Sequence, residues 1–245
     1  MTRCDHIRVF DVISSCVALA LLSPLLLLTA LILRFTGEGE VIYLQKRVGV
    51  GGQDFGMYKF VTMRRDSERL KGGLMTAKGD PRVLPVGRVL RKTKINELLQ
   101  FINVVIGDMS IVGPRPQVRP HFEAYSERVQ RELEKLRPGV TGIGSIVFRD
   151  EEDILAAAGD DRERVYREVI APLKGDLECW YLQHRSLRLD LLLCFITAAF
   201  LVWPQPRLLW ALFKDLPRPE PEIAEFLGVQ DLASTAGQQR VSQAG

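Results

Sequence analysis

The sequence predicts a mainly helical α+β protein that is attached to a membrane near its amino-terminal end. Three observations support this fold class. Residues 12–33 carry no charge, apolar residues recur at helical spacing in later segments, and two apolar runs flank a glycine-rich segment at 49–52. We divide the chain into a membrane segment at 1–36, a folded domain at 37–215 with a small β-hairpin and interfacial helices, and a tail at 216–245 that we expect to be disordered.

Composition excludes several classes of protein. The 245 residues include 33 Lys and Arg against 30 Asp and Glu, and a net charge of +3 is too small to indicate a nucleic-acid partner. Hydrophobic residues make up 47% and charged residues 26%, as in globular chains. None of the four cysteines forms a C-x-x-C pair, so we expect reduced thiols in a domain that faces the cytoplasm.

The uncharged stretch at 12–33 is long enough to cross a bilayer and is followed by no small-residue cleavage site, which favours a retained anchor over a cleaved signal. Ser23 and Pro24 stand at its middle, where proline removes one helical hydrogen bond. Two structures fit these features: a kinked spanning helix, or a helix-break-helix hairpin that enters one leaflet and returns. Positive charge on both flanks gives no orientation, so both alternatives stay open.

The elements that follow are expected in order. Runs at 41–44 and 55–61 predict two strands, and 62–80 is polar and irregular or briefly helical. Helical spacing from Ile95 to Val105 predicts a helix with Thr93 as N-cap, which places Asn96 and Glu97 in its first turn. This helix ends near Gly107, and a rigid proline-fixed turn follows at 111–116.

The second half of the chain is expected to be mostly helical. Helices are predicted at 121–136 and at 151–182, the second interrupted at Pro172, with an extended segment at 143–148 between them. The apolar run at 191–203 is too short to span a bilayer. Trp203, Trp210 and Phe213 favour helices that lie on the membrane surface, and the alternative is a buried pair of helices.

The first turn at Asn96 and Glu97 is the best candidate site. A helix amino terminus offers free N–H groups and a partial positive charge to anions. Arg91, Lys92 and Lys94 precede this turn, and the two prolines beside Arg115 restrict how its guanidinium is presented to a phosphate. Together these residues suggest a diphosphate site, and the alternative is a capped surface helix with solvated lysines.

Other polar residues carry weaker signals. His6, His121 and His184 lack metal-ligand spacing, and we interpret each as a surface group. The acidic run at 150–153 offers ligands for Mg²⁺, but a solvated helix start explains it better.

Several strings of residues carry a family resemblance. They are SP at 23–24, QKRVG at 45–49, KFVTM at 59–63, DPRV at 80–83, ELLQFINV at 97–104, GDMSIVGPRP at 107–116 and RPGVTG at 137–142. In this order they resemble the bacterial sugar transferases, small monotopic polyprenyl-phosphate phosphoglycosyl transferases. The resemblance covers about residues 7 to 205.

The resemblance implies both a topology and a reaction. Members take a nucleotide diphosphate sugar, commonly a UDP-sugar, and move its sugar phosphate to polyprenyl phosphate at the cytoplasmic face of the bacterial inner membrane, with Mg²⁺ as cofactor. The amino-terminal helix of the family is a re-entrant hairpin broken at Ser-Pro, which here is Ser23-Pro24. The implied partners are the nucleotide sugar, polyprenyl phosphate and the lipid bilayer, with downstream glycosyltransferases and a homo-oligomer left open.

The sequence departs from the family at its Asp-Glu dyad, which here reads Asn96-Glu97. An amide is a far weaker nucleophile than a carboxylate and brings no negative charge to Mg²⁺. Val61 replaces the usual basic residue, and Leu99 stands where proline is common. Three interpretations follow: Glu97 is the nucleophile or metal ligand while Asn96 orients the phosphate; transfer is direct with Glu97 as base; or the chain is a catalytically impaired relative that binds a ligand or a partner.

The prediction for the site combines both lines of reasoning. Asn96 and Glu97 occupy the catalytic positions, Glu97 also being the expected Mg²⁺ ligand. Arg91, Arg115 and Lys59 are expected to bind the phosphates or the rest of the substrate. The favoured function is phosphoglycosyl transfer that begins the assembly of a glycan, and the alternative is a membrane-bound binding module.

Overall fold

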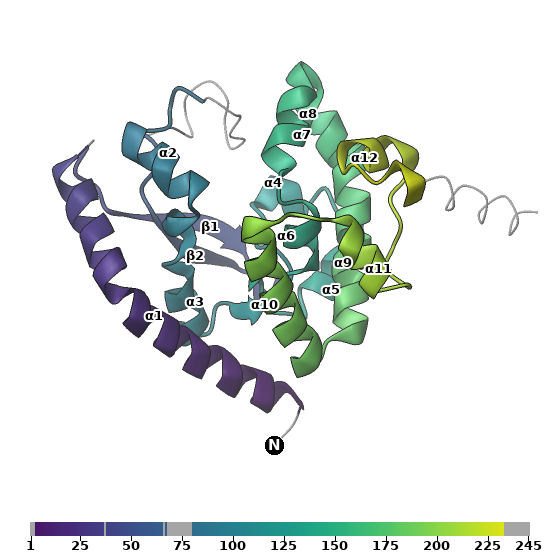
Figure 1. The fold of residues 1–245 in the computed structure, drawn as a ribbon, viewed down its shortest axis with the longest axis horizontal. Helices are drawn as coiled ribbons and strands as arrows, with labels where there is room; N and C mark the ends of the chain where they lie inside the picture. Colours follow the sequence, from purple (N-terminus) through teal and green to yellow (C-terminus); the bar gives the residue numbers. More distant parts are fainter. Residues whose placement is uncertain (1–2, 37, 66, 68–79, 233–245) are drawn as a thin grey trace, which may run out of the picture.

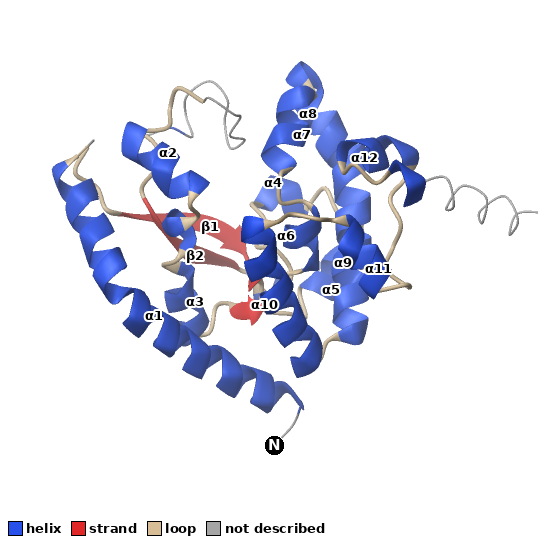
Figure 2. Ribbon diagram, in the orientation of Figure 1, coloured by secondary structure: helices blue, strands red, loops and turns tan. Residues whose placement is uncertain are grey.

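The computed structural model describes residues 3–36, 38–65, 67 and 80–232. The chain begins with helix α1, Arg3–Phe35, which curves along one side of the molecule (Figure 1). The strands lie in the middle, with helices on both sides of them (Figure 2). The mainly helical fold with a small antiparallel sheet and one long apolar amino-terminal helix is therefore confirmed.

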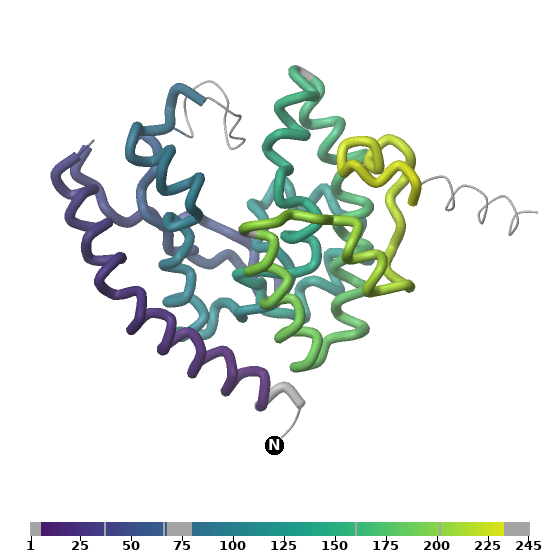
Figure 3. Tube along the Cα trace, in the orientation of Figure 1, coloured from purple at the N-terminus to yellow at the C-terminus, as the bar shows by residue number. Residues whose placement is uncertain are grey.

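Helix α1 is the one helix in the described part of the chain that is long and apolar enough to cross a membrane. It runs through Pro24 without a break, and Figure 3 shows it as one continuous curve. Pro24 has no N–H to donate to the carbonyl of Ala20, and the Ser23 hydroxyl donates to that oxygen instead, at 2.8 Å. A hairpin with two separate helices is therefore not observed.

Strands β1, Ile42–Val48, and β2, Asp54–Phe60, form the predicted hairpin. They pair antiparallel, with Ile42 opposite Phe60 and Val48 opposite Asp54. The connection Val50–Gly52 is a 3₁₀ turn in which Gly51 has φ of 67°, a value that side chains disfavour. The Gly-rich segment is therefore a turn, and β1 extends four residues beyond the predicted strand at 41–44.

The predicted helix start at Thr93 is wrong. Helix α2, Pro85–Lys92, ends there, and the Thr93 hydroxyl donates to the carbonyls of Val89 and Leu90. Lys94 then takes a left-handed conformation with φ of 59°, and a 3₁₀ turn, Ile95–Glu97, leads to helix α3, Gln100–Ile106. The polar residues before α3 therefore follow a helix end. Asn96 and Glu97 lie in a separate turn.

A second small sheet holds the segment after α3. Strand β3, Ser110–Val112, pairs parallel with β4, Gly139–Thr141, and the turn of 113–116 follows β3. Between the strands lie α4, Arg119–Phe122, and α5, Glu127–Leu133, which divide the helix predicted at 121–136. A Cβ added to Gly113 would meet the backbone of Arg137 and Gly139, and one added to Gly142 would meet the backbone of Gly113, so this packing requires glycine at both positions.

The segment at 143–148 was expected to be extended, but Ile143–Val147 forms helix α6, which packs on α9 and α10. Then come α7, Glu151–Ala157, a short 3₁₀ turn, α8, Arg162–Arg164, and a π-helical turn, Val165–Ile170. Helix α9, Ala171–His184, continues from it. The backbone stays helical through Pro172, but the hydrogen-bond pattern changes just before it, because the π-helical turn Val165–Ile170 ends where α9 begins and Pro172 has no N–H to donate.

The carboxyl-terminal helices complete the main core. They are α10, Leu187–Val202, α11, Arg207–Leu212, and α12, Pro221–Phe226. Trp203 is 71% exposed, but Trp210 is buried and its indole N–H donates to the carbonyl of Pro217 at 2.9 Å. Phe213 also packs on the core, against Trp180. The interfacial interpretation therefore remains a prediction for Trp203 and is wrong for Trp210 and Phe213.

The predicted disordered tail is folded over its first part. Ile223 and Ala224 of α12 and the following Val229 are buried in the main core. Residues 233–245 lie outside the described part of the chain. Cys16, Cys179 and Cys194 are free thiols, as expected, and the side chain of Cys4 is not among those described.

Candidate active site

A cavity of about 670 Å³ opens between the hairpin, α2, the turn before α3, the Pro114–Pro116 segment and the start of α7. All five predicted site residues line it: Lys59, Arg91, Asn96, Glu97 and Arg115. Ten Lys or Arg side chains and six Asp or Glu side chains contribute to its wall. This excess of positive charge in a concave site favours a polyanionic ligand.

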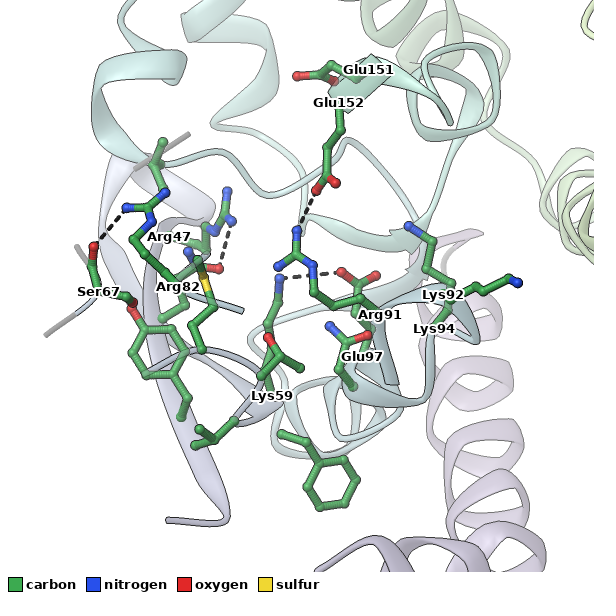
Figure 4. Close-up of a pocket in the computed structure, with 18 of the residues that line it drawn as sticks. Arg47, Lys59, Ser67, Arg82, Arg91, Lys92, Lys94, Glu97, Glu151 and Glu152 are labelled. Atoms are coloured by element: carbon green, nitrogen blue, oxygen red, sulfur yellow. Dashed lines mark hydrogen bonds and ion pairs between the residues drawn. The ribbon is translucent and has the colours of Figure 1, made fainter. Parts of the chain in front are cut away.

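Glu97 and Lys59 face each other in the cavity (Figure 4). Lys59 Nζ lies 3.4 Å from Glu97 Oε1, and the two side chains are 16% and 25% exposed. Burial acts to raise the pKa of Glu97, but Lys59, Arg115 and Lys94 outweigh it and lower that pKa to about 2. Burial lowers the pKa of Lys59 to about 8, although Glu97 opposes the shift. Glu97 is therefore an ionised carboxylate at neutral pH.

Two arginines add charge beside this pair. Arg47 of β1 donates to the carbonyl of Pro116 at 3.0 Å, which ties the hairpin to the proline-flanked segment. Burial, and then the charge of Arg115, lowers the pKa of Arg47 to about 10. The Arg115 side chain is accessible to solvent within the cavity, although protein surrounds it. Partial loss of water acts to lower its pKa, but Glu97 and Glu151 outweigh this and raise it. Both guanidinium groups are thus charged at neutral pH, as a phosphate site requires.

Asn96 presents an unpaired oxygen. Its side chain is buried, at 6% exposure, and its Oδ1 has no hydrogen-bond partner in the described part of the protein. An unpaired buried polar atom costs about 1–3 kcal/mol, so it calls for an explanation. One explanation is a ligand in the adjoining cavity that supplies Oδ1 with a hydrogen-bond donor or a cation.

Arg91 and the acidic start of α7 meet across the cavity. Arg91 donates to Glu152 at 2.7 Å, as Figure 4 shows. The acidic run at 150–153 lines the cavity and begins α7. Glu152 is 60% exposed, as expected of a solvated helix start, whereas Glu151 is 18% exposed and pairs with Lys174.

A layer of buried charge lies behind the wall and was not foreseen from the sequence. Lys174 is fully buried and pairs with Glu151, above the rings of Phe148 and Tyr166. Glu178 is 1% exposed, and its Oε1 accepts a hydrogen bond from the Arg115 backbone N–H at 3.3 Å. Burial raises the pKa of Glu178 to about 7. One signal was available: Lys174 and Glu178 are four residues apart on an otherwise apolar helical face.

Among the three histidines, His6 and His184 are exposed, as expected, whereas His121 differs from its interpretation as a surface group. The His121 ring stacks on Tyr166 with centroids 4.0 Å apart and lines the cavity, and burial lowers its pKa. His184 stacks on Trp180 and lies 3.0 Å from Asp215, away from the cavity.

The acidic groups set a limit on any metal site. Among the described residues no group of three or more His, Cys, Asp or Glu side chains is arranged to hold a metal. Glu97 and Asn96 are adjacent in the chain and both line the cavity, and Asn96 Oδ1 has no hydrogen-bond partner among the described residues. They fit Mg²⁺, which binds through one or two protein oxygens together with substrate phosphates and water.

The fold thus combines one helix that is long and apolar enough to cross a membrane with a concave site rich in positive charge. The family described as Bacterial sugar transferase matches residues 4–204. The chain belongs to this family.

Curated relatives agree with this family. The chain is 36% identical over 192 residues to UDP-N-acetylgalactosamine-undecaprenyl-phosphate N-acetylgalactosaminephosphotransferase of Aeromonas hydrophila, covering 78% of this chain and 42% of the relative. It is 36% identical over 193 residues to UDP-glucose:undecaprenyl-phosphate glucose-1-phosphate transferase of Escherichia coli (strain K12), covering 78% and 39%. Exopolysaccharide production protein ExoY of Rhizobium meliloti (strain 1021) is 35% identical over 204 residues, covering 78% and 82%. The chain thus spans about two fifths of the length of the first two relatives.

Proposed function

We propose that the protein transfers a sugar phosphate from a UDP-sugar to polyprenyl phosphate, the first membrane step in assembling an exopolysaccharide, O-antigen or glycoprotein glycan. The observation that carries the proposal is the ionised Glu97, paired with Lys59 in a cationic cavity. The names of the relatives support it, because the Aeromonas and Escherichia proteins are named for such transfers to undecaprenyl phosphate. No observation favours the alternative of a binding module.

The pKa of Glu97 helps to choose among the three interpretations of the dyad. A carboxylate with a pKa of about 2 is a poor base at neutral pH, which disfavours direct transfer with Glu97 as general base. It is, however, always available as an anionic nucleophile or metal ligand. We therefore assign the nucleophile position to Glu97, with Asn96 orienting the phosphate.

The reaction then has two balanced steps. A Glu97 carboxylate oxygen attacks the phosphorus that carries the sugar, the bond to the bridging oxygen breaks, and UMP leaves with that oxygen and its electron pair. A phosphate oxygen of polyprenyl phosphate next attacks the same phosphorus, which frees Glu97 and yields polyprenyl diphosphate sugar. Lys59, Arg91 and Arg115 neutralise the phosphate charge in both steps. Mg²⁺, held by Glu97 and Asn96 together with the diphosphate, would neutralise further charge when bound.

The membrane topology is part of the same proposal. We place α1 as a re-entrant segment whose two ends face the cytoplasm, at the bacterial inner membrane. Positive residues on both flanks of 12–33 and Pro24 at its middle support this arrangement. Trp203, exposed after α10, supports a second contact with the membrane surface.

The test measures UMP release by the purified protein from a panel of UDP-sugars with polyprenyl phosphate and Mg²⁺. We expect release by the wild type and its loss in Glu97→Gln, because the amide has no anionic oxygen. Full turnover in Glu97→Gln would place the chemistry elsewhere, and no release with any sugar would exclude the transferase.

The covalent step has its own test by intact-protein mass, with UDP-sugar and no lipid acceptor. A sugar-phosphate adduct is expected on Glu97 in the wild type. Asn96→Asp should fold and should keep or gain the two-step reaction, because the cations around the cavity stabilise an added carboxylate. An adduct that maps to Asn96 in the wild type contradicts the assignment.

A further inference from the structure

One turn of α1 contacts both segments that carry the site. Arg8 and Asp11 are three residues apart and therefore lie on one face of the helix. The Arg8 guanidinium donates to the carbonyls of Val104 at 2.6 Å and Val105 at 3.0 Å. Asp11 accepts from the Ser110 hydroxyl at 2.5 Å and, through its other oxygen, from the backbone N–H of Ile111 at 3.1 Å.

These contacts satisfy polar groups at the end of α3 and the start of β3. Val104 and Val105 lie in the last turn of α3, where a positive charge is favoured, and the Val104 carbonyl also accepts from the Gly107 N–H at 3.2 Å. Asp11 is 3% exposed and Ser110 1%, so losing a partner would leave buried polar atoms unpaired. The link between α1 and the core is therefore directional and fixes one register of α1 against α3 and β3.

The opposite ends of the same two elements carry the site. Helix α3 has seven residues and begins directly after the turn that holds Asn96 and Glu97. Strand β3 has three residues and ends at Val112, just before Gly113, Pro114 and Arg115. In elements this short, a displacement at the end near α1 is transmitted to the end near the cavity.

We propose that Arg8 and Asp11 form a clamp that sets the position of Glu97 relative to Arg115. Both are positioning residues, since neither lines the cavity. Through this clamp, the position of α1 in the bilayer determines whether Glu97 and Arg115 are correctly placed to bind phosphate. Its consequence for turnover rests on the proposed function, whereas its consequence for the structure of the site does not.

The first test uses amide hydrogen exchange and needs neither substrate nor turnover. Arg8→Ala and Asp11→Ala, in lipid nanodiscs, should speed exchange at Ile111 and also in 95–98 and at Arg115 and Gln117. Arg34→Ala is the matched control, because it removes a charge from the other end of α1, where Arg34 donates to the carbonyl of Gly39 at 3.2 Å. Arg8→Lys and Asp11→Asn, which each retain part of the hydrogen bonding, should show smaller effects and serve if the alanine variants fail to fold.

The second test separates positioning from loss of folded protein. A clamp variant should lower kcat/KM roughly 10- to 100-fold, with a KM for the UDP-sugar at least 3-fold higher and weaker binding of UDP. Loss of folded protein alone lowers the apparent kcat and leaves KM and the Kd for UDP unchanged. A wild type that releases no UMP would overturn the proposed function, and the exchange data would still decide the clamp. Faster exchange confined to Ile111, with 95–98 and Arg115 unchanged, would overturn the clamp.

Discussion

Lys59 and Glu97 form a pair in which burial and charge act on the two residues differently. Burial lowers the pKa of Lys59. Burial also acts to raise the pKa of Glu97, but three nearby cations outweigh it and lower that pKa. As a result Glu97 stays ionised far into the acid range, and Lys59 is the member of the pair that titrates nearest to neutral pH. A change of activity on the alkaline side should therefore report Lys59.

We expect kcat/KM for UMP release to fall as the pH rises through about 8, because Lys59 then loses the proton that makes it a cation beside Glu97. The measurement is the pH profile of kcat/KM from pH 6 to 10. Lys59→Arg should keep its charge across this range and move the alkaline limb upward. An alkaline limb at the same pH in Lys59→Arg would assign the titration to another group.

The raised pKa of Glu178 gives a second prediction, on how the free energy of unfolding changes with pH. Its folded-state pKa of about 7 exceeds the ordinary value of 4.5, so its contribution to stability is full below pH 4.5 and is lost as the pH rises through 7. Glu178→Gln keeps an acceptor for the Arg115 N–H and has no charge to bury. The variant should match the wild type near pH 4.5 and exceed it at pH 8 by about 3 kcal/mol in the free energy of unfolding. Thermal unfolding at both pH values checks this, and equal melting temperatures at pH 8 would contradict it.

Among the elements, those with a strong pattern were predictable and those set by tertiary contacts were not. The hairpin followed from two apolar runs around a glycine-rich turn, and α1 from its length and lack of charge. The turn at 95–97 was not predictable, because Thr93 suits either end of a helix and the left-handed Lys94 leaves no signature. Helix α6 was missed since buried helices and buried strands share short apolar runs.

Only the part of the site that lies in or near short sequence strings could be predicted. Lys59, Glu97 and Arg115 stand in recognisable strings, Arg91 and Asn96 lie shortly before one of these strings, and the fold brings all five to one cavity. The partners behind the wall come from α9, and pairs such as Lys174 with Glu151 exist only through packing. No spacing rule connects residues on separate helices.

Two tryptophans near the ends of α10 and α11 lie in opposite environments: Trp203, directly after α10, is exposed, and Trp210 of α11 is buried. This difference gives a prediction. Trp210→Ala should destabilise the fold by about 3–5 kcal/mol, because it empties a buried site and frees the carbonyl of Pro217. Trp203→Ala is the matched variant and should leave the free energy of unfolding unchanged while weakening binding to lipid vesicles. Thermal unfolding and vesicle co-sedimentation together test this. Similar losses of stability in both variants would count against it.

For the whole molecule, the topology of α1 depends on its middle. Pro24 removes a backbone hydrogen bond, and the Ser23 hydroxyl offers the freed carbonyl a partner. Pro24→Ala should restore the helical hydrogen bond and shift some molecules from the re-entrant arrangement to a spanning one. The measurement is the accessibility of a thiol placed at residue 2 to a membrane-impermeant reagent outside the cell. Labelling of the wild type from outside would contradict the re-entrant topology.

Arg8 and Asp11 are far along the chain from the residues that they contact, and this separation has a consequence for biosynthesis. Their partners follow 96 to 100 residues later. At a synthesis rate of about 5–20 residues per second, Arg8 and Asp11 are made roughly 5 to 20 seconds before their partners. If α1 enters the bilayer as proposed, it can do so before its partners exist, and the rest of the chain would then fold against a helix that lipid already surrounds. Delivery to the membrane is in this sense an early step in folding the site, and a chain that reaches the membrane late must close its core around an apolar helix still in water.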